Sequence, residues 1–238
     1  MMRDGDTVER RRHPRVALVG PDGAGKSTLS RMLEDAPLPF RVKRIYMGIN
    51  LESSSLMLPT TRLLLTAKRA RGHRPDLAVG GASRLAVAPG RSLLGPARHG
   101  SRELARLGVW VLEEWLRQVV AGWYSLRGFV VVFDRHFYAD YYSAGPAGAG
   151  AFQVLHGWLL RHAYPKPDLV ICLDAPGEVL YARKQEASVD WLERRRVDYL
   201  ALASAVPALS VVDADRPLEL VFTDVVEAIT EYWKAASA

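Results

Sequence analysis

A glycine-rich stretch near the start of the chain limits the fold more than any other part of the sequence. Residues 15–28 read RVALVGPDGAGKST, in which four apolar residues lead into glycine, four further residues, glycine, lysine and serine. Segments of this pattern join a buried strand to a helix and hold phosphate groups. The alternative is a chance glycine-rich turn. Because an apolar strand precedes the segment and a helical pattern follows it, we favour the phosphate-binding interpretation.

The residue types in this stretch suit the binding of a polyphosphate. Gly20, Gly23 and Gly25 allow tight turns, so that successive N–H groups can point at one anion. Lys26 adds a mobile positive charge, and the hydroxyl of Ser27 is a ligand for Mg²⁺. A helix that begins near Lys26 turns the positive end of its dipole toward the phosphates.

Composition favours one globular domain. The 238 residues, of which 49% are hydrophobic, can bury one sizeable core, most simply as one domain with an insertion. The single cysteine, Cys172, excludes an intramolecular disulfide and is interpreted as a small buried hydrophobe. The first residues lack the apolar segment of a secretory signal, and no run of about 18 apolar residues predicts a membrane span. The expected compartment is the cytoplasm.

Apolar runs and helical periodicity alternate along the rest of the chain. The purest run, FVVVFD at 129–134, indicates a strand buried on both faces, as in a parallel sheet covered by helices. Residues 1–14 are expected to form a flexible arm. The expected strands are 16–19, 40–47, 129–134, 169–173 and 209–212, and the expected helices are 26–35, 101–126, a segment carrying Glu178 to Glu186, a segment carrying Arg194 to Tyr199, and 217–234.

The long helix expected at 101–126 has apolar residues at helical spacing, which predicts that this face packs into the core. By the same spacing its tryptophans are interpreted as core residues rather than as platforms for a ligand. The periodic apolar residues are Leu104, Leu107, Val111, Trp115 and Val119, and the tryptophans are Trp110, Trp115 and Trp123.

Residues 51–100 break this pattern and predict a basic insertion with one or two short helices. Between residues 51 and 106, ten basic residues stand against three acidic ones, so the net charge of +6 is concentrated here. Such a surplus suits nucleic acid, anionic lipid or an anionic substrate, and residues 59–71 offer a weak amphipathic pattern for a membrane surface. It is also typical of a solvated arginine-rich surface, which we favour.

A second group of polar residues follows the strand expected at 129–134. The carboxyl ends of parallel strands share one edge of the sheet, so Asp134 is expected beside the glycine-rich stretch, where it can hold Mg²⁺ directly or through water. Arg135 can bind a second phosphate through two parallel hydrogen bonds. The alternative is an ordinary pair of charges at a strand end, which we disfavour because of the phosphate-binding pattern upstream.

Arginines cluster on the two helices expected after the fourth strand. Arg183 on the first helix and Arg194 to Arg196 on the second are candidates for lid residues that neutralise charge in a transition state. The alternative is a solvated helix face with Glu–Arg pairs. Of these arginines we favour Arg183.

Four segments in this order resemble the thymidylate kinase-like members of the P-loop nucleoside monophosphate kinases. They are GPDGAGKST at 20–28, FDRH at 133–136, PKPDLVICLDAPGEVLYAR at 165–183 and VVDADRP at 211–217. The resemblance covers nearly the whole chain except residues 1–14 and 51–100. It implies an α/β fold with a five-stranded parallel sheet and helices on both faces, as a three-layer sandwich, and one kinase domain over residues 15–238 with a lid at about 183–197.

The resemblance also implies ATP with Mg²⁺ as the phosphate donor and a small-molecule acceptor between the Asp-Arg segment and the long helix. In that family Asp22 would contact the acceptor sugar and Arg135 its phosphate. Ala24 stands where some members have an arginine, so Arg183 or one of Arg194 to Arg196 must supply that charge. The implied catalytic residues are Lys26, Asp22, Asp134, Arg135 and Arg183; the metal ligands are Ser27 and Asp134; the ATP-binding residues are Gly20, Asp22, Gly23, Ala24, Gly25, Lys26, Ser27, Thr28, Arg183, Asp213 and Ala214.

The acceptor side of the chain departs from this family. Residues 46–50 read YMGIN where the dTMP enzymes have Arg-Glu-Pro-Gly, and Glu113 lies near the position of a nucleotide-binding arginine. Ser143 and Ala144 replace a Tyr-Gln pair. The expected acceptor is a dTMP-like nucleoside monophosphate, and the alternative is a hydroxyl group of a non-nucleotide metabolite.

A hypothesis from another class is a nucleotide-dependent binding module, in which the glycine-rich stretch switches the basic insertion toward an anionic partner. The Asp-Arg segment and the lid arginines favour the enzyme, because phosphoryl transfer uses them and a switch does not need them. We therefore expect an ATP-dependent phosphotransferase whose partners are ATP and a small acceptor. A homodimer remains open, and nucleic acid is disfavoured.

Overall fold

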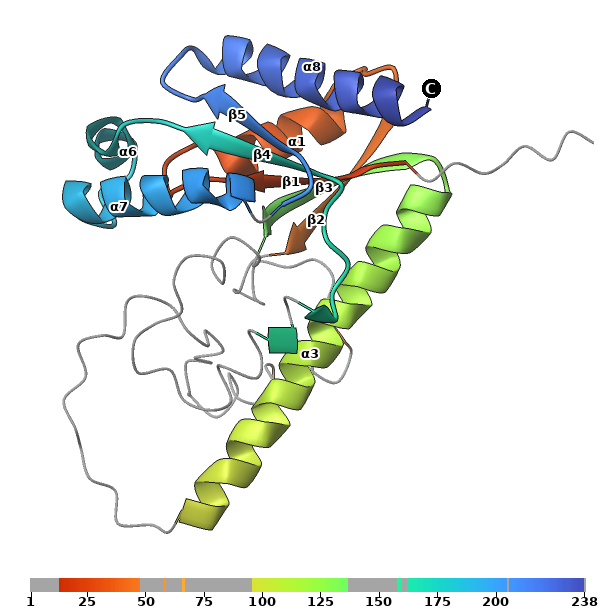
Figure 1. The fold of residues 1–238 in the computed structure, drawn as a ribbon, viewed down its shortest axis with the longest axis vertical. Coiled ribbons are helices and arrows are strands. Elements are labelled where there is room, and N and C mark those ends of the chain that lie inside the picture. Colours follow the sequence, from red (N-terminus) through yellow and green to blue (C-terminus); the bar gives the residue numbers. More distant parts are fainter. Residues whose placement is uncertain are drawn as a thin grey trace, which may run out of the picture.

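A computed structural model of the chain describes residues 13–47, 58, 66, 96–136, 158–159, 162–204 and 206–237. It is an α/β fold built on a five-stranded parallel sheet (Figure 1). The strands are β1 (Arg15–Val19), β2 (Arg41–Met47), β3 (Phe129–His136), β4 (Leu169–Asp174) and β5 (Leu209–Asp213). The helices are α1 (Lys26–Asp35), α3 (Pro96–Leu126), α6 (Gly177–Arg183), α7 (Val189–Leu200), the 3₁₀ helix η3 (Ala201–Ser204) and α8 (Leu218–Ser237).

The strands lie in the order β2-β3-β1-β4-β5, so that β1 is the central strand. In register, Leu18 of β1 pairs with Asp134 of β3 on one side and with Ile171 of β4 on the other. Strands β1, β3 and β4 are continuous apolar runs and are buried along most of their length. This is the pattern of parallel strands that are covered on both faces.

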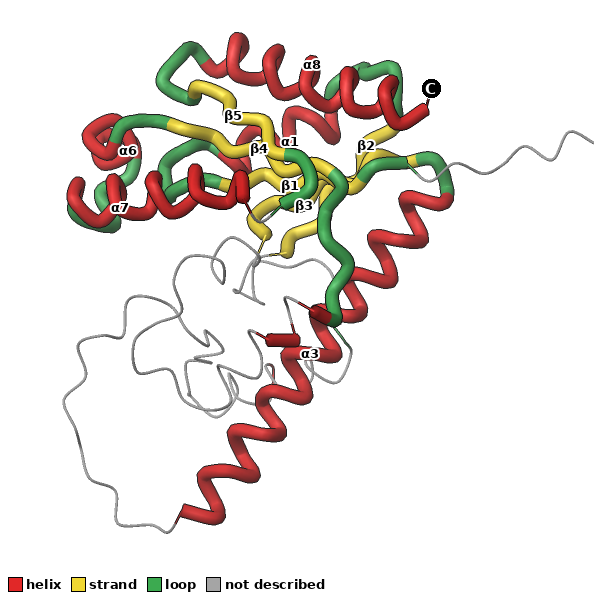
Figure 2. Tube along the Cα trace, viewed as in Figure 1, coloured by secondary structure: helices red, strands yellow, loops and turns green. Residues whose placement is uncertain are grey.

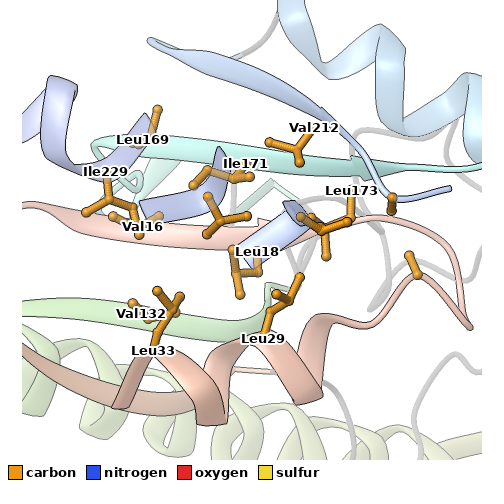
Figure 3. Packing of buried hydrophobic residues seen from close by; sticks show 14 of the residues in the cluster. Val16, Leu18, Leu29, Leu33, Val132, Leu169, Ile171, Leu173, Val212 and Ile229 are labelled. Atoms are coloured by element: carbon orange, nitrogen blue, oxygen red, sulfur yellow. The ribbon is translucent and has the colours of Figure 1, made fainter. Parts of the chain in front are cut away.

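Alternate side chains of the strands enter two separate cores. On one face, Val16 and Leu18 pack with Leu29 and Leu33 of α1 and with Ile229 of α8 (Figure 3). On the other face, residues of opposite parity pack against the C-terminal part of α3 and the end of α7. These include Ala17, Val19, Val131, Phe133, Ala121 and Tyr199. The sheet is therefore the middle layer between helices on both sides (Figure 2).

The chain leaves β1 and β4 in opposite directions. After β1 it continues through α1 toward β2, and after β4 it continues through α6 and α7 toward β5. Helix α1 packs on one face of the sheet and the end of α7 packs on the other. Such a point of divergence leaves a crevice at the carboxyl ends of the two strands, where α/β proteins bind ligands. Residues 20–27, which we call the glycine-rich loop, begin at this edge.

Most of the predicted elements are confirmed to within a residue or two. Helix α3 begins at Pro96 rather than at 101, so residues 96–100 belong to the helix and not to the insertion. The predicted helix carrying Glu186 is wrong at its end, because α6 stops at Arg183 and Lys184 is its C-cap. The last residues of the expected arm are packed: His13 stacks near Trp233, with ring centroids 5.8 Å apart, and Val131 donates a hydrogen bond to the Pro14 carbonyl.

The predicted orientation of α3 is wrong. Where its side chains are described, the apolar stripe faces outward, with Trp115 39%, Trp123 46% and Val119 63% exposed. Leu104, Leu107 and Trp110, also predicted to face the core, lie outside the described side chains. Apart from Ala121, the buried residues of this helix are polar, and these are Glu113, Glu114, Arg117, Gln118 and Ser125. Helical spacing identifies an amphipathic helix, but it does not say which face meets the sheet. Helix α3 also extends well beyond the sheet at its N-terminal end (Figure 2).

The predicted arm at residues 1–12 and nearly all of the predicted insertion at 51–95 lie outside the described residues, as does the amphipathic pattern at 59–71. Ser143 and Ala144 also lie outside them. Among the helices that the structure describes, none has an apolar stretch long enough to cross a lipid bilayer.

Candidate functional site

The glycine-rich loop approaches two backbone carbonyls so closely that glycine is required. Gly20 has φ +140°, and a Cβ atom placed on it would lie 2.5 Å from the carbonyl oxygen of Leu173 in β4. Gly23 has φ +90°, and its Cβ would lie 2.8 Å from the carbonyl oxygen of Leu180 in α6. L-residues rarely adopt such φ values, and neither backbone neighbour can yield easily. The loop therefore packs directly against the backbone of β4 at Gly20 and against that of α6 at Gly23.

Within the described part of the chain, the N-terminus of α1 has no side-chain cap. Its N-cap residue is Gly25, with φ +91°, which offers no side chain for a capping hydrogen bond, and no acidic residue lies in the first turn. By contrast, Ser188 at the start of α7 accepts a hydrogen bond from the Trp191 backbone N–H. The first N–H groups of a helix need an acceptor, and the helix dipole favours a negative one. The start of α1 is thus suited to an anion.

Lys26 is folded over the loop that precedes it. Its Nζ donates hydrogen bonds to the carbonyl oxygens of Gly20 and Pro21, each at 2.6 Å, and the residue is only 7% exposed. These contacts hold the ammonium group at the mouth of the loop, next to the uncapped N-terminus of α1. The ammonium group of Lys26 therefore lies close to the positive end of the α1 dipole.

Ser27 and Asp134 meet as predicted. The Ser27 hydroxyl donates a hydrogen bond of 3.0 Å to Oδ1 of Asp134, which is 2% exposed. Hydroxyl and carboxylate oxygens are the hard ligands that Mg²⁺ prefers, and Mg²⁺ commonly takes one or two protein ligands with phosphate oxygens and water. The two residues therefore fit a Mg²⁺ site. Within the described part of the chain, no group of three or more His, Cys, Asp or Glu side chains is placed to hold a metal.

Arg44 is a residue of this site that the sequence analysis missed. Its Nη1 lies 3.4 Å from Oδ2 of Asp134, and its Nε lies 3.4 Å from a carboxylate oxygen of Glu34. Because Val42, Arg44 and Tyr46 alternate on β2, they share one face of the sheet with Asp134, whose partner in register is Tyr46. Strand alternation alone was the signal that could have identified Arg44.

Asp22 and Arg135, which were both predicted to contact the acceptor, pair with each other. Nη2 of Arg135 lies 3.0 Å from Oδ1 of Asp22. Burial raises the pKa of Asp22, but the charges of Lys26 and Arg135 outweigh it and hold that pKa below its usual value. Among the described residues Arg135 is the one non-glycine residue with positive φ, at 61°. Such strain is typical of functional positions.

The predicted lid arginines have different environments. Nη1 of Arg183 donates a 2.9 Å hydrogen bond to the carbonyl oxygen of Ala214, one of the predicted ATP-binding residues, and so joins α6 to the segment that follows β5. Arg196 is held by Asp174 through hydrogen bonds of 2.6 and 2.9 Å and by Glu193 at 2.8 Å. Arg194 is exposed. Arg195 contacts Tyr199 of its own helix, with its Nη2 3.2 Å from the Tyr199 hydroxyl. Arg183 thus contacts another predicted ATP-binding residue, and Arg196 anchors α7 to the end of β4.

The remaining predicted residues fall around the same edge of the sheet. Ala24 and Ala214 are buried at 3% exposure, and the Ala214 N–H donates to the carbonyl of Asp174 at 2.6 Å. Thr28 is exposed on the first turn of α1. Asp213 ends β5 with a side chain that is 61% exposed. Cys172 is buried as predicted, and burial with the nearby Asp174 carboxylate raises its pKa to about 12.

Helix α3 adds a buried polar cluster that no sequence pattern had indicated. Glu113, Glu114, Arg117 and Gln118 are each at most 4% exposed. Burial lowers the pKa of Arg117, while Glu113, Glu114 and Tyr46 act in the opposite direction. The pKa of the Tyr164 hydroxyl is raised, mainly by burial. The charge of Glu114 and its hydrogen bond with the Tyr164 hydroxyl raise this pKa further. We call Glu113, Glu114, Arg117 and Gln118 the α3 polar cluster.

Tyr46 lies within electrostatic range of both the α3 polar cluster and the arginine that pairs with the glycine-rich loop. Its phenol influences the pKa of Arg117 and also that of Arg135, the partner of Asp22. The structure thus brings together a turn of backbone N–H groups, a lysine, a hydroxyl–carboxylate pair and the polar side of α3.

No protein-family model matches this chain, and no curated protein matches it significantly.

Proposed function

We propose that the protein is an ATP-dependent phosphotransferase, which transfers the γ-phosphate of ATP to the phosphate of a small acceptor, as the thymidylate kinase-like P-loop kinases do. The observation that carries the proposal is the uncapped N-terminus of α1 inside the glycine-rich loop. Lys26 lies over this loop, and the Ser27–Asp134 pair lies beside it. An uncapped helix start with a lysine and hard oxygen ligands suits a magnesium-bound polyphosphate better than it suits a neutral ligand.

The residues divide the work of phosphoryl transfer among binding, orientation and charge stabilisation. The N–H groups of the loop and Lys26 would hold the β- and γ-phosphates, and Arg183 would neutralise charge from the α6 side. Ser27 and Asp134 would hold Mg²⁺, which supplies charge neutralisation of the phosphates. Arg135 and Asp22 would orient the acceptor, after exchanging their mutual ion pair for contacts with it.

The proposed reaction balances without a proton. An oxygen of a dianionic acceptor phosphate forms a bond to the γ-phosphorus, and the bond between that phosphorus and the β–γ bridging oxygen breaks. The electron pair of the broken bond remains on ADP. The lowered pKa of Asp22 supports a phosphate acceptor over a hydroxyl, because a hydroxyl acceptor must lose a proton and an ion-paired carboxylate is a weak base.

ATP binding and turnover test this proposal separately. MgATP at about 100 times its Kd stabilises a folded protein by about 2.7 kcal/mol, which corresponds to roughly 5–10 °C in Tm for a domain of this size. The Lys26→Ala variant is expected to lose this shift and to lose acceptor-stimulated release of ADP. Lys234→Ala, an exposed lysine in the last turn of α8, is the control and should behave as the wild type.

The acceptors to be assayed are nucleoside monophosphates, sugar phosphates and hydroxyl-bearing metabolites. If MgATP gives a thermal shift but none of these acceptors stimulates the release of ADP, the nucleotide-dependent binding module would be favoured. ADP release that requires a hydroxyl compound without phosphate would favour the alternative kinase. Wild-type turnover by Lys26→Ala would refute the role assigned to the lysine.

A further inference from the structure

The α3 polar cluster is an unfavourable way to pack a helix against a sheet. Glu113 is fully buried and Gln118 is 4% exposed, while Leu112 and Val119 on the other side of the helix are 61% and 63% exposed. Burial of a carboxylate or an amide costs free energy unless each polar atom has a partner. If apolar packing alone decided the orientation of α3, the apolar stripe would face the sheet. The polar side chains therefore have another reason to face inward.

Two members of the cluster lack partners at buried atoms. Oε1 of Glu113 accepts a hydrogen bond of 3.0 Å from the Leu58 backbone N–H, but its Oε2 is buried and accepts none from the described residues. Gln118 has both Nε2 and Oε1 buried and without a hydrogen-bond partner, within the part of the chain that the structure describes. A buried polar group without a partner destabilises the folded protein, because it has lost its hydrogen bonds to water. A ligand that pairs these atoms would recover that cost.

The cluster lies on the helix that packs against the two strands leading to the proposed acceptor site. Helix α3 packs against β2 and β3, which carry Tyr46 and Arg135 near their carboxyl ends. Arg135 pairs with Asp22 of the glycine-rich loop. A molecule whose phosphate is held by Arg135 would therefore extend its remaining part past Tyr46 toward α3.

The unpaired atoms define the chemistry of that remaining part. A carboxylate oxygen accepts hydrogen bonds only, so a ligand must offer a donor to Glu113, while the Gln118 amide can both accept and donate. The edge of thymine or uracil offers Glu113 a single N–H, and the carbonyl oxygens on both sides of that N–H would be repelled by the carboxylate. An amino group or a set of hydroxyl groups presents the donors instead.

We propose that the acceptor is a monophosphate whose head group is rich in hydrogen-bond donors, amino or hydroxyl groups, and that Glu113 and Gln118 determine this specificity. The inference rests on the proposed phosphotransferase function. Two sources share this chemistry, an amino-substituted base such as cytosine and an amino or polyhydroxy sugar. It predicts discrimination against dTMP and UMP.

Equilibrium binding tests the inference without requiring turnover. Calorimetry with the full chain would compare CMP with UMP and glucosamine 6-phosphate with dTMP. CMP has an amino group where UMP has a carbonyl, and its ring N3 accepts a hydrogen bond where that of UMP donates one. At least one donor-rich probe should bind tenfold or more tightly than UMP and dTMP. Equal or tighter binding of dTMP and UMP would overturn the inference, and so would the absence of binding by both CMP and glucosamine 6-phosphate.

Variants on α3 connect this preference to the named residues. Glu113→Gln replaces an acceptor oxygen by an amide of the same shape and should lower the preference for the donor-rich probe over its partner by tenfold or more. Gln118→Ala, which removes the unpaired amide, should weaken the same probe and serves if Glu113→Gln fails to fold. Val119→Ala on the exposed side is the control. An unchanged preference in both folded variants would refute the assignment.

The outcomes separate this inference from the proposed function. The thermal shift with MgATP reports on the glycine-rich loop and does not involve α3. A normal MgATP shift with a preference for dTMP would refute the specificity and leave the phosphotransferase intact. The loss of the MgATP shift would refute the phosphotransferase, while the ratio of CMP to UMP binding would still report on α3.

Discussion

Gly20 is the residue at which the backbone of the glycine-rich loop approaches β4 most closely among the loop glycines. Its φ of +140° and the Leu173 carbonyl 2.5 Å from a hypothetical Cβ leave room for hydrogen only. Gly25 differs, because its φ is +91° but no atom lies within 4 Å of a Cβ placed there. The sequence pattern treats these glycines alike, yet one is needed for close approach and the other for backbone conformation alone.

We predict that Gly20→Ala lowers the free energy of unfolding by about 2–3 kcal/mol, because it combines backbone strain with a collision against a carbonyl that belongs to the central sheet. Urea denaturation would measure this change. The matched control is Gly122→Ala on α3, where a Cβ meets nothing within 4 Å and where alanine should stabilise the helix by up to about 1 kcal/mol. A Gly20→Ala variant as stable as the wild type would contradict the described loop.

One arginine of helix α7 forms an ion pair with the sheet, in addition to the apolar packing of Leu192 and Tyr199. Arg196 forms two hydrogen bonds with Asp174 at the end of β4, and Glu193 of the same helix holds its third nitrogen. These contacts raise the pKa of Arg196, first through the Asp174 carboxylate. Glu193 also accepts a hydrogen bond from the Gly177 backbone N–H at the start of α6. The predicted lid therefore contains a fixed ion-pair network in addition to candidate catalytic arginines.

We predict that Arg196→Lys destabilises the protein by about 1–2 kcal/mol, because lysine keeps the charge but cannot form two parallel bonds with Asp174. Arg194→Lys is the control, since Arg194 is exposed and its replacement should change stability by less than about 0.5 kcal/mol. Thermal denaturation of the two variants side by side would measure the difference. Equal effects would show that the bidentate contact contributes nothing.

The whole molecule is stabilised by two cores on opposite faces of the sheet, and one buried histidine couples that stability to pH. His136 ends β3, is 4% exposed, and has its ring centroid 5.2 Å from that of Phe133. Burial lowers its pKa to about 3. The neutral imidazole is therefore the form that the folded protein accommodates at neutral pH.

We predict that the free energy of unfolding falls as the pH drops below about 6.5. Because the folded-state pKa of His136 is below the unfolded value, the unfolded chain binds more protons in this range. The loss from this group should reach about 2–3 kcal/mol near pH 4.5. Carboxylates with lowered pKa values, such as Asp22, act at lower pH. A His136→Phe variant should show a flatter profile in urea titrations between pH 7 and 4.5, and an unchanged slope would exclude this histidine as the cause.

The order of strands and helices along the chain could be predicted from the sequence. Each buried parallel strand is a continuous apolar run, and such a run can be recognised from neighbouring residues alone. The runs at 16–19, 129–134 and 169–173 appear as β1, β3 and β4. The meeting of Ser27 with Asp134 was also predictable, since both residues follow strands whose carboxyl ends share one edge.

Contacts between distant residues required the tertiary structure. The partners of Arg196 and Arg135, the approach of Arg44 to Asp134, and the face of α3 that meets the sheet depend on which elements become neighbours. Periodicity reports that α3 has an apolar and a polar side, and it correctly predicts a helix. Only the packing of the folded chain, in which α3 contacts β2 and β3, decides that the polar side with Glu113 and Gln118 is buried.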